Sequence, residues 1–173
     1  MPSIGSTPAT KYRGNPAIFG RLVEDHDLHR HLFAELGATT GASAARTALL
    51  RELTKEVKGH AAAEEQALWS TVLRKPEITE DGRHAVAEHH ELDELLDDLA
   101  AADMASPGWL RKFEHVKERY LHHIREEEQE LFVDVEKHLT PADQRHMRGV
   151  FNRRKAAEKA KAKVVPKKKT KED

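Results

Sequence analysis

Apolar residues recur every three or four positions through most of the chain, which is the spacing of one buried face on an α-helix. Loop signals, chiefly glycine, proline and capping residues, interrupt this spacing at regular intervals. The pattern predicts four long helices, from Pro16 to the Gly37–Gly41 loop, from Ser43 to Pro76, from about Asp81 to Asp103, and from Ser106-Pro107 to Val135. No stretch alternates polar and apolar residues with β-branched enrichment, so strands are not expected.

Three capping signals mark where helices should begin. Ser43 is a candidate N-cap, and Ser106-Pro107 and Thr140-Pro141 each combine a capping hydroxyl with proline at the first helical position. Thr140-Pro141 should open a short fifth helix that fades into a Lys/Ala-rich tail. The chain is therefore predicted to be all-α. Its expected parts are a disordered polar N-terminus at residues 1–15, an up-down-up-down four-helix bundle at residues 16–140, and a C-terminal helix with a basic tail at residues 141–173.

The composition narrows the chemistry. Among 173 residues there are no cysteines and twelve histidines. The lack of cysteine excludes disulfides, cysteine-bound zinc, iron–sulfur clusters and thiol nucleophiles. No run of 18 apolar residues is present, so no membrane span is expected, and the N-terminus lacks the apolar core of a secretory signal. The expected location is the cytoplasm.

Charge is distributed unevenly along the chain. From Arg153 to Asp173 there are ten Lys/Arg residues against three acids, so the remaining body is acidic. A Lys-rich tail can make weak contact with a polyanion by neutralising phosphates. It lacks interleaved aromatic residues, so specific base stacking is not expected. A flexible, solubilising tail is the favoured interpretation.

An internal repeat selects a few of the twelve histidines. A His followed four residues later by Glu lies on one helix face and can chelate a metal. This spacing occurs six times, so it decides nothing alone. Shifting the sequence by 63 residues superimposes chemically matched positions of the two halves. The pairs that could hold a metal are His26 with His89, His60 with His123, and Glu64 with Glu127.

The predicted turns place these residues at one level of the bundle. The midpoints between His26, His60, His89 and His123 fall within or close to the three predicted turns, so one histidine from each helix should enter the same interior layer. Glu64 and Glu127 lie one helical turn further along. Buried carboxylates need a compensating cation. Four imidazoles and two carboxylates suit a pair of metal ions with the carboxylates bridging, and positions would remain open for a small ligand.

At these residues the sequence resembles the hemerythrin family, in particular the bacterial HHE cation-binding domains. The resemblance lies in LVEDHDLHRHLF, GHAAAEEQALW, AEHHELDELL and HHIREEEQELF, and covers about residues 18–140. It implies a four-helix bundle with a non-haem di-iron centre. The ligands it implies are His26, His60, Glu64, His89, His123 and Glu127, with both glutamates bridging. Manganese or zinc would also accept these ligand types.

The sequence departs from the oxygen-carrying members at one ligand. Those proteins have a fifth histidine four residues from the one on the third helix, and here Ala85 and Asp93 stand at those positions. His29, whose repeat partner is Leu92, is a candidate substitute. It could equally be a hydrogen-bonded histidine beside the site. The departure argues against reversible oxygen carriage and leaves metal binding intact.

Other polar residues near the motifs are expected to have lesser roles. Asp25 is interpreted as a solvated acid in preference to one that orients a ligand. The acidic run Glu126–Glu130 is expected to face solvent except for Glu127, and His84, His90 and His122 are expected at the surface or its boundary.

Three functions fit these features. The first is a di-iron protein that binds or reacts with O2, peroxide or NO in oxidative or nitrosative stress response or sensing. If it is an enzyme, weak catalase-like decomposition of peroxide is the favoured reaction. The second is a module that buffers or senses iron or another divalent metal without redox catalysis. The third is a metal-free helical interaction protein whose tail binds a polyanion. A monomer or a dimer is compatible with each.

Overall fold

The computed structural model describes residues 8–162, and this part of the chain is helical with no strand. The prediction of an all-α protein is confirmed. The elements are α1 (Ile18–Gly37), α2 (Ala44–Glu64), η1 (Glu65–Trp69), α3 (Ser70–Val72), α4 (Thr79–Ala101), α5 (Trp109–Glu126), η2 (Glu127–Leu131), α6 (Phe132–Glu136) and α7 (Pro141–Ala162). The η segments are π-helical turns.

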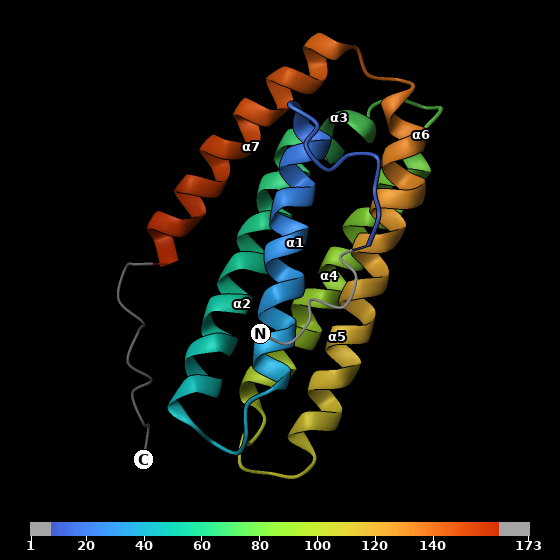
Figure 1. Cartoon of the computed structure of the whole chain (residues 1–173). Coiled ribbons are helices and arrows are strands. Elements are labelled where there is room, and N and C mark those ends of the chain that lie inside the picture. The colour runs from blue at the N-terminus through green and yellow to red at the C-terminus, as the bar shows by residue number, and fades with distance from the viewer. Residues whose placement is uncertain (1–7, 163–173) are drawn as a thin grey trace, which may run out of the picture.

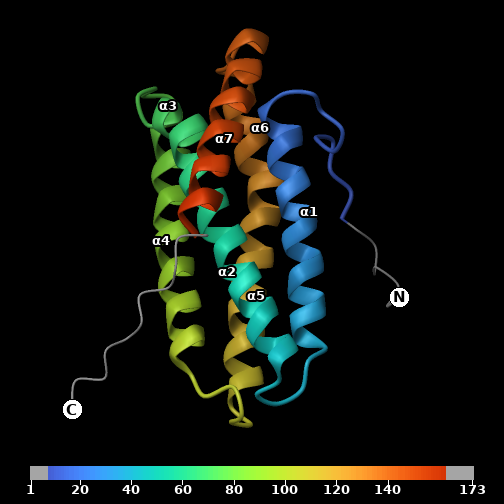
Figure 2. The same ribbon diagram turned by 90° about the vertical axis from the view of Figure 1, so that its left-hand side faces the viewer.

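The four long helices α1, α2, α4 and α5 lie side by side in both views (Figures 1 and 2). The segment η1 joins α2 directly to α3, and η2 joins α5 directly to α6. The second and fourth predicted helices are therefore each one continuous helical rod that contains a π-helical turn. None of the helices described is long and apolar enough to cross a membrane.

The apolar core is divided into two clusters. One contains Phe19, Trp69 and Phe132, and the other contains Phe33 and Trp109. On each long helix, histidines and acids occupy the positions between residues of the first cluster and residues of the second. A polar layer thus lies between two apolar regions, and its contents are the candidate site.

The predicted caps are correct at two of three positions. The Ser43 hydroxyl accepts a hydrogen bond from the Arg46 backbone N–H, and Thr140 and Asp143 cap each other before α7. At the third position α5 begins later than expected, at Trp109. There the Ser106 hydroxyl accepts from the Gly108 N–H and forms a turn ahead of the helix.

Residues 8–15 are packed against the helices, which corrects the predicted disorder for this part of the N-terminus. Tyr12 is only 2% exposed, and its ring contacts Phe19 and Phe132. Its hydroxyl donates a hydrogen bond to Glu136, 2.6 Å away. Arg13 binds Asp27 through two nitrogens. The remaining residues of the predicted disordered segment, 1–7, lie outside the described part.

The fifth helix, α7, is 22 residues long, which corrects the prediction of a short one. It packs across α1 and α2 (Figures 1 and 2) and buries Met147 and Phe151. Its last turns include the start of the predicted basic tail, Arg153–Lys161, which is therefore helical. The rest of that tail, residues 163–173, lies outside the described part of the chain.

Candidate metal centre

The six residues selected by the repeat meet in the polar layer. His26 comes from α1, His60 and Glu64 from α2, His89 from α4, His123 from α5, and Glu127 from the first position of η2. None is more than 6% exposed. Residues that lie up to 101 positions apart in sequence thus enter one enclosed site.

Each glutamate lies between histidines of different helices. Glu64 Oε2 is 3.2 Å from His60 Nε2 and 3.4 Å from His89 Nε2. Glu127 Oε1 is 2.7 Å from His123 Nε2 and 3.8 Å from His26 Nε2. Each glutamate therefore links a histidine from one half of the repeat to a histidine from the other half.

The π-helical turns coincide with the two glutamates. The segment η1 begins directly after Glu64, and η2 begins at Glu127 itself. A π-helical turn accommodates an extra residue within a helix, and such turns are frequent at functional sites. Apolar periodicity cannot reveal a single such turn, so neither turn was predicted.

Three histidines are held in place by a carboxylate behind the ring. The distance from Nδ1 to the carboxylate oxygen is 2.9 Å for His60 and Asp25, 3.0 Å for His123 and Glu88, and 2.8 Å for His26 and Glu128. Burial raises the pKa of each carboxyl group, but the hydrogen bond from its histidine together with the positive charges nearby outweighs burial and lowers that pKa. The carboxylates therefore accept a hydrogen bond from Nδ1–H, and Nε2 of each ring faces the interior.

These contacts correct two predictions about acidic residues. Asp25 is 5% exposed and orients His60 rather than facing solvent. Glu128, assigned to a solvated face, is buried and binds both His26 and Arg30. The repeat contained the missing signal, because the 63-residue shift superimposes Asp25 on Glu88 and Glu65 on Glu128.

The site therefore has an approximate two-fold symmetry that extends beyond the six selected residues. Asp25 and His60 are 35 residues apart, as are Glu88 and His123. The symmetry is looser at Glu65, whose carboxylate is 3.9 Å from His89 Nδ1, whereas its repeat partner Glu128 is 2.8 Å from His26.

The donor atoms that face the interior have no hydrogen-bond partner within the described chain. They include Nε2 of His26, His60 and His89 and both carboxylate oxygens of Glu64 and Glu127. Buried polar atoms are nearly always paired, and leaving them unpaired is costly. Unpaired imidazole nitrogens and carboxylate oxygens in one enclosed layer fit metal ions as the missing partners. The six residues remain the predicted ligands.

Without a cation the two carboxylates repel each other. Burial and the neighbouring charge of Glu64 raise the pKa of Glu127 well above its ordinary value of 4.5. Two facing carboxylates in a dry site therefore favour sharing a proton. A metal ion would replace that proton.

His29 also points into the layer. It is fully buried, and its Nδ1 lies 2.5 Å from the Tyr120 hydroxyl. Its Nε2 has no partner, and its ring is 5.2 Å from that of His60 between centroids. A nitrogen of His29, one of His60 and an oxygen of Asp25 lie within 4.8 Å of one another. The structure thus places His29 beside the His26–His60 pair.

Comparison with known proteins identifies the family. The sequence model of the hemerythrin HHE cation-binding domain matches residues 17–134. The chain belongs to the hemerythrin HHE family. The resemblance seen in the sequence is confirmed, and a metal-binding function follows from it together with the His and carboxylate clusters.

The hemerythrin fold is also found by structural comparison. The chain is similar to the crystal structure of a hemerythrin HHE cation-binding domain-containing protein from Mycobacterium kansasii, with a TM-score of 0.74 and 21% sequence identity. The similarity covers 89% of this chain and 90% of that one, so it includes more than the family domain alone. A search of curated proteins gave no match.

One side of the hemerythrin site contains a small cavity of about 10 Å³. The residues that line it include His60, His89, His123, Tyr120 and Ala61. This volume is about what one water-sized molecule needs. Leu92, the repeat partner of His29, also lines the cavity, so the two halves of the domain differ here: a histidine fills one side and a small space remains on the other.

A buried lysine from α7 completes the surroundings of Asp25. Lys155 is 3% exposed, and its Nζ lies 2.6 Å from Asp25 and 2.9 Å from Glu56. Arg21 binds the other oxygen of Asp25 at 2.7 Å. The chain of contacts Lys155–Asp25–His60 links α7 to a predicted metal ligand. Lys155 lies in the segment predicted to be a solvated basic tail, so its burial against Asp25 corrects that prediction at this residue.

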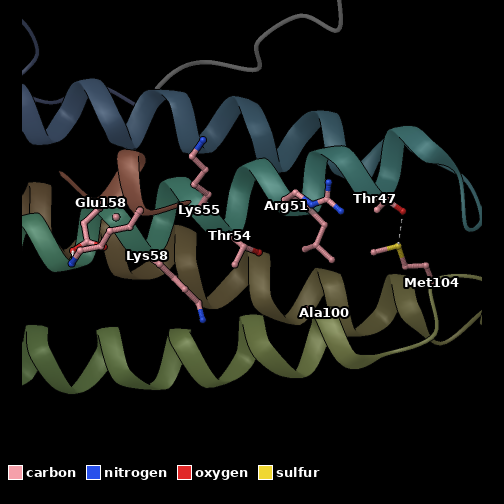
Figure 3. A pocket seen from close by; sticks show the side chains of 11 residues that line it. Thr47, Arg51, Thr54, Lys55, Lys58, Ala100, Met104 and Glu158 are labelled. Carbon is pink, nitrogen blue, oxygen red and sulfur yellow. Dashed lines mark hydrogen bonds and ion pairs between the residues drawn. The ribbon is translucent and has the colours of Figure 1, made fainter. Parts of the chain in front are cut away.

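A wider groove of about 630 Å³ lies elsewhere on the domain, between α2, the end of α4 and the last turns of α7. Figure 3 shows Thr47 and Met104 at one end of it and Glu158 at the other. None of the predicted metal ligands lines this groove. The chemistry of the protein is therefore assigned to the enclosed histidine and glutamate layer.

Proposed function

We propose that this chain is a di-iron hemerythrin-like protein that binds or reacts with O2, peroxide or NO, in oxidative or nitrosative stress response or sensing. The observation that carries the proposal is the set of unpaired inner atoms of His26, His60, His89, Glu64 and Glu127 within one buried layer. His123 completes the set through its contact with Glu127. Iron bound there would supply open coordination positions and electrons for small oxidants.

The two histidine groups of the layer are unequal. His26, His29 and His60 lie close together, with ring centroids 5.1 and 5.2 Å apart for the two pairs that include His60. His89 and His123 form the other group, 5.0 Å apart. We assign His29 as the seventh ligand, because its wholly buried Nε2 has no other partner. With His29 included, His26, His29 and His60 offer three ring nitrogens to a metal, whereas His89 and His123 offer two.

The small cavity adjoins this less complete group. It is lined by His89, His123 and His60, and His29 does not line it. We assign the small-ligand position to this cavity. Its small volume and the apolar side chains of Val57 and Leu92 exclude bulky reductants and leave room only for a molecule about the size of water.

Filling the cavity tests this assignment. Ala61 lines it, so Ala61→Val adds two methyl groups at the ligand position. Because overpacking costs about 1–3 kcal/mol, we expect NO binding to the reduced, iron-loaded protein to weaken by roughly tenfold or more. Visible spectra taken during NO titration measure this. Ala62→Val is the matched control, because the neighbouring residue does not line the cavity and should leave NO binding unchanged.

The same preparation separates the candidate functions. The proposal predicts that the spectrum of iron-loaded protein changes with O2, NO or peroxide, and that peroxide releases oxygen if the centre is catalytic. If the protein holds two iron ions and none of these molecules changes its spectrum, the small-ligand function is wrong. That outcome would favour reversible metal buffering or sensing.

A further inference from the structure

A second cluster of histidines and glutamates lies outside the layer described above. His84 and Glu88 are one turn apart on α4, and His122 and Glu126 are one turn apart on α5. His84 Nε2 lies 2.7 Å from Glu126 Oε1 and 3.2 Å from Glu88 Oε1. His122 Nε2 lies 3.3 Å from Glu126 Oε2. Ligand atoms of His84, Glu88 and Glu126 lie within 4.8 Å of one another, and His122 adjoins them through Glu126.

These separations are close to those of ligands around one metal ion. Nitrogen and oxygen atoms bound to tetrahedral zinc at about 2.0–2.2 Å lie about 3.3–3.6 Å from one another. Two of the three distances above, 3.2 and 3.3 Å, are close to this range. The distance from His84 Nε2 to Glu126 Oε1, 2.7 Å, is shorter than this range. The His84 side chain is 47% exposed, so it has room to move outward.

Burial within the cluster also favours a cation. The carboxylate side chains of Glu88 and Glu126 are only 11% and 18% exposed, whereas the two imidazoles are about half exposed. The acids are therefore partly removed from water, and the ligands that face solvent are histidines. An ion can enter from solvent without rearrangement of the helices.

The other exposed His-Glu pairs of the chain show that this arrangement is not a consequence of spacing alone. His31 pairs with Glu35 on α1, and His90 pairs with Glu94 on α4, each on a single helix. Neither takes part in a group of three or more possible ligands within the described residues, whereas His84, Glu88 and Glu126 do.

We propose that His84, Glu88 and Glu126 form an outer binding site for one divalent metal ion of the zinc or iron(II) class, with His122, which contacts Glu126 Oε2, as the adjoining fourth ligand. Two imidazoles and two carboxylates are ligands that such borderline ions accept. Glu88 connects this outer site to the inner one, because its Oε1 also accepts the hydrogen bond from His123 Nδ1 at 3.0 Å.

Zinc titration of the iron-loaded full chain tests the outer site, with iron measured before and after. We expect one zinc ion per chain to bind without loss of iron. His84→Ala combined with His122→Ala should weaken this binding at least tenfold. The control combines His31→Ala with His90→Ala, which removes two exposed histidines from single-helix pairs and should leave zinc binding unchanged.

A second variant tests a glutamate that belongs to the outer site alone. Glu126→Gln keeps the size of the side chain but removes its charge, so zinc binding should weaken while the iron content stays the same. The proposal is wrong if wild-type protein takes up zinc only as it loses iron, if it takes up none, or if the outer variant binds zinc as wild type does.

Discussion

Removing the metal ions with a chelator should lower the melting temperature of this protein by roughly 10 °C. A ligand present at about 1,000 times its dissociation constant stabilises the folded state by about 4 kcal/mol. For a chain of this size, each kcal/mol shifts the midpoint by about 2–4 °C. The physical origin is the buried pair Glu64 and Glu127, whose oxygens have no partner within the described chain. Differential scanning calorimetry with and without chelator measures the shift.

The variant Glu127→Gln provides the matched control. In metal-free protein, burial and the charge of Glu64 raise the pKa of Glu127 well above 4.5, which favours its neutral form. The neutral amide should therefore leave the metal-free melting temperature almost unchanged. With metal the same variant should melt well below wild type, because it loses a bridging carboxylate. A wild-type midpoint that does not change on chelation would contradict the metal-dependent fold and support a metal-free interaction protein.

Replacing Lys155 by methionine should destabilise the protein by about 3 kcal/mol or more, since removing one partner of a buried ion pair leaves an uncompensated charge. The ammonium of Lys155 is buried between Asp25 and Glu56. Loss of this contact also frees Asp25, which orients His60, so iron affinity should fall together with stability. Chemical denaturation at neutral pH measures the first effect, and iron titration measures the second.

Lys159 offers a comparison on the same helix. It also binds Glu56, at 3.2 Å, but its side chain is 49% exposed. An exposed ion pair contributes only about 0–1 kcal/mol. We therefore expect Lys159→Met to have a small effect on the free energy of unfolding and no effect on iron affinity. Equal effects of the two substitutions would show that the burial of Lys155 does not matter.

The stability that Lys155 provides should depend on pH in a definite direction. Burial opposes ionisation of Glu56, but the hydrogen bonds and charges of Lys155 and Lys159 together outweigh it and lower the pKa of Glu56 below its ordinary 4.5, with Lys155 as the larger contributor. A lowered carboxyl pKa adds stability that is present above 4.5 and is lost as the pH falls through the folded-state value. In metal-free protein, the difference between wild type and Lys155→Met should therefore shrink as the pH drops below 4.5.

The sequence predicted the four long helices and the convergence of the six repeat-selected residues, because both depend on regular spacing. Matching the two halves separated His60 and His123 from several other histidines with the same local pattern. The turns then placed one histidine per helix at a common level, as the structure shows.

Apart from the predicted ligands, the burial of individual charged residues was not predicted. Asp25 and Glu128 have acidic repeat partners, but acids on a charged helix are usually solvated, so both were expected to face solvent. Lys155 lies in a segment with many lysines and arginines, so the composition of that segment did not indicate that this lysine is buried. The length of α7 was underestimated for the same reason, since its polar residues give little apolar periodicity apart from Met147 and Phe151.

Metal analysis together with a visible spectrum tests the central claim most directly. Full-length protein purified from iron-replete cells should contain two iron ions per chain and absorb in the near ultraviolet and visible. His60→Ala or His123→Ala should lose both the iron and the absorption, whereas His90→Ala, at an exposed histidine on α4, should retain them. Protein that contains no metal, or a single zinc ion per chain, would contradict the di-iron centre.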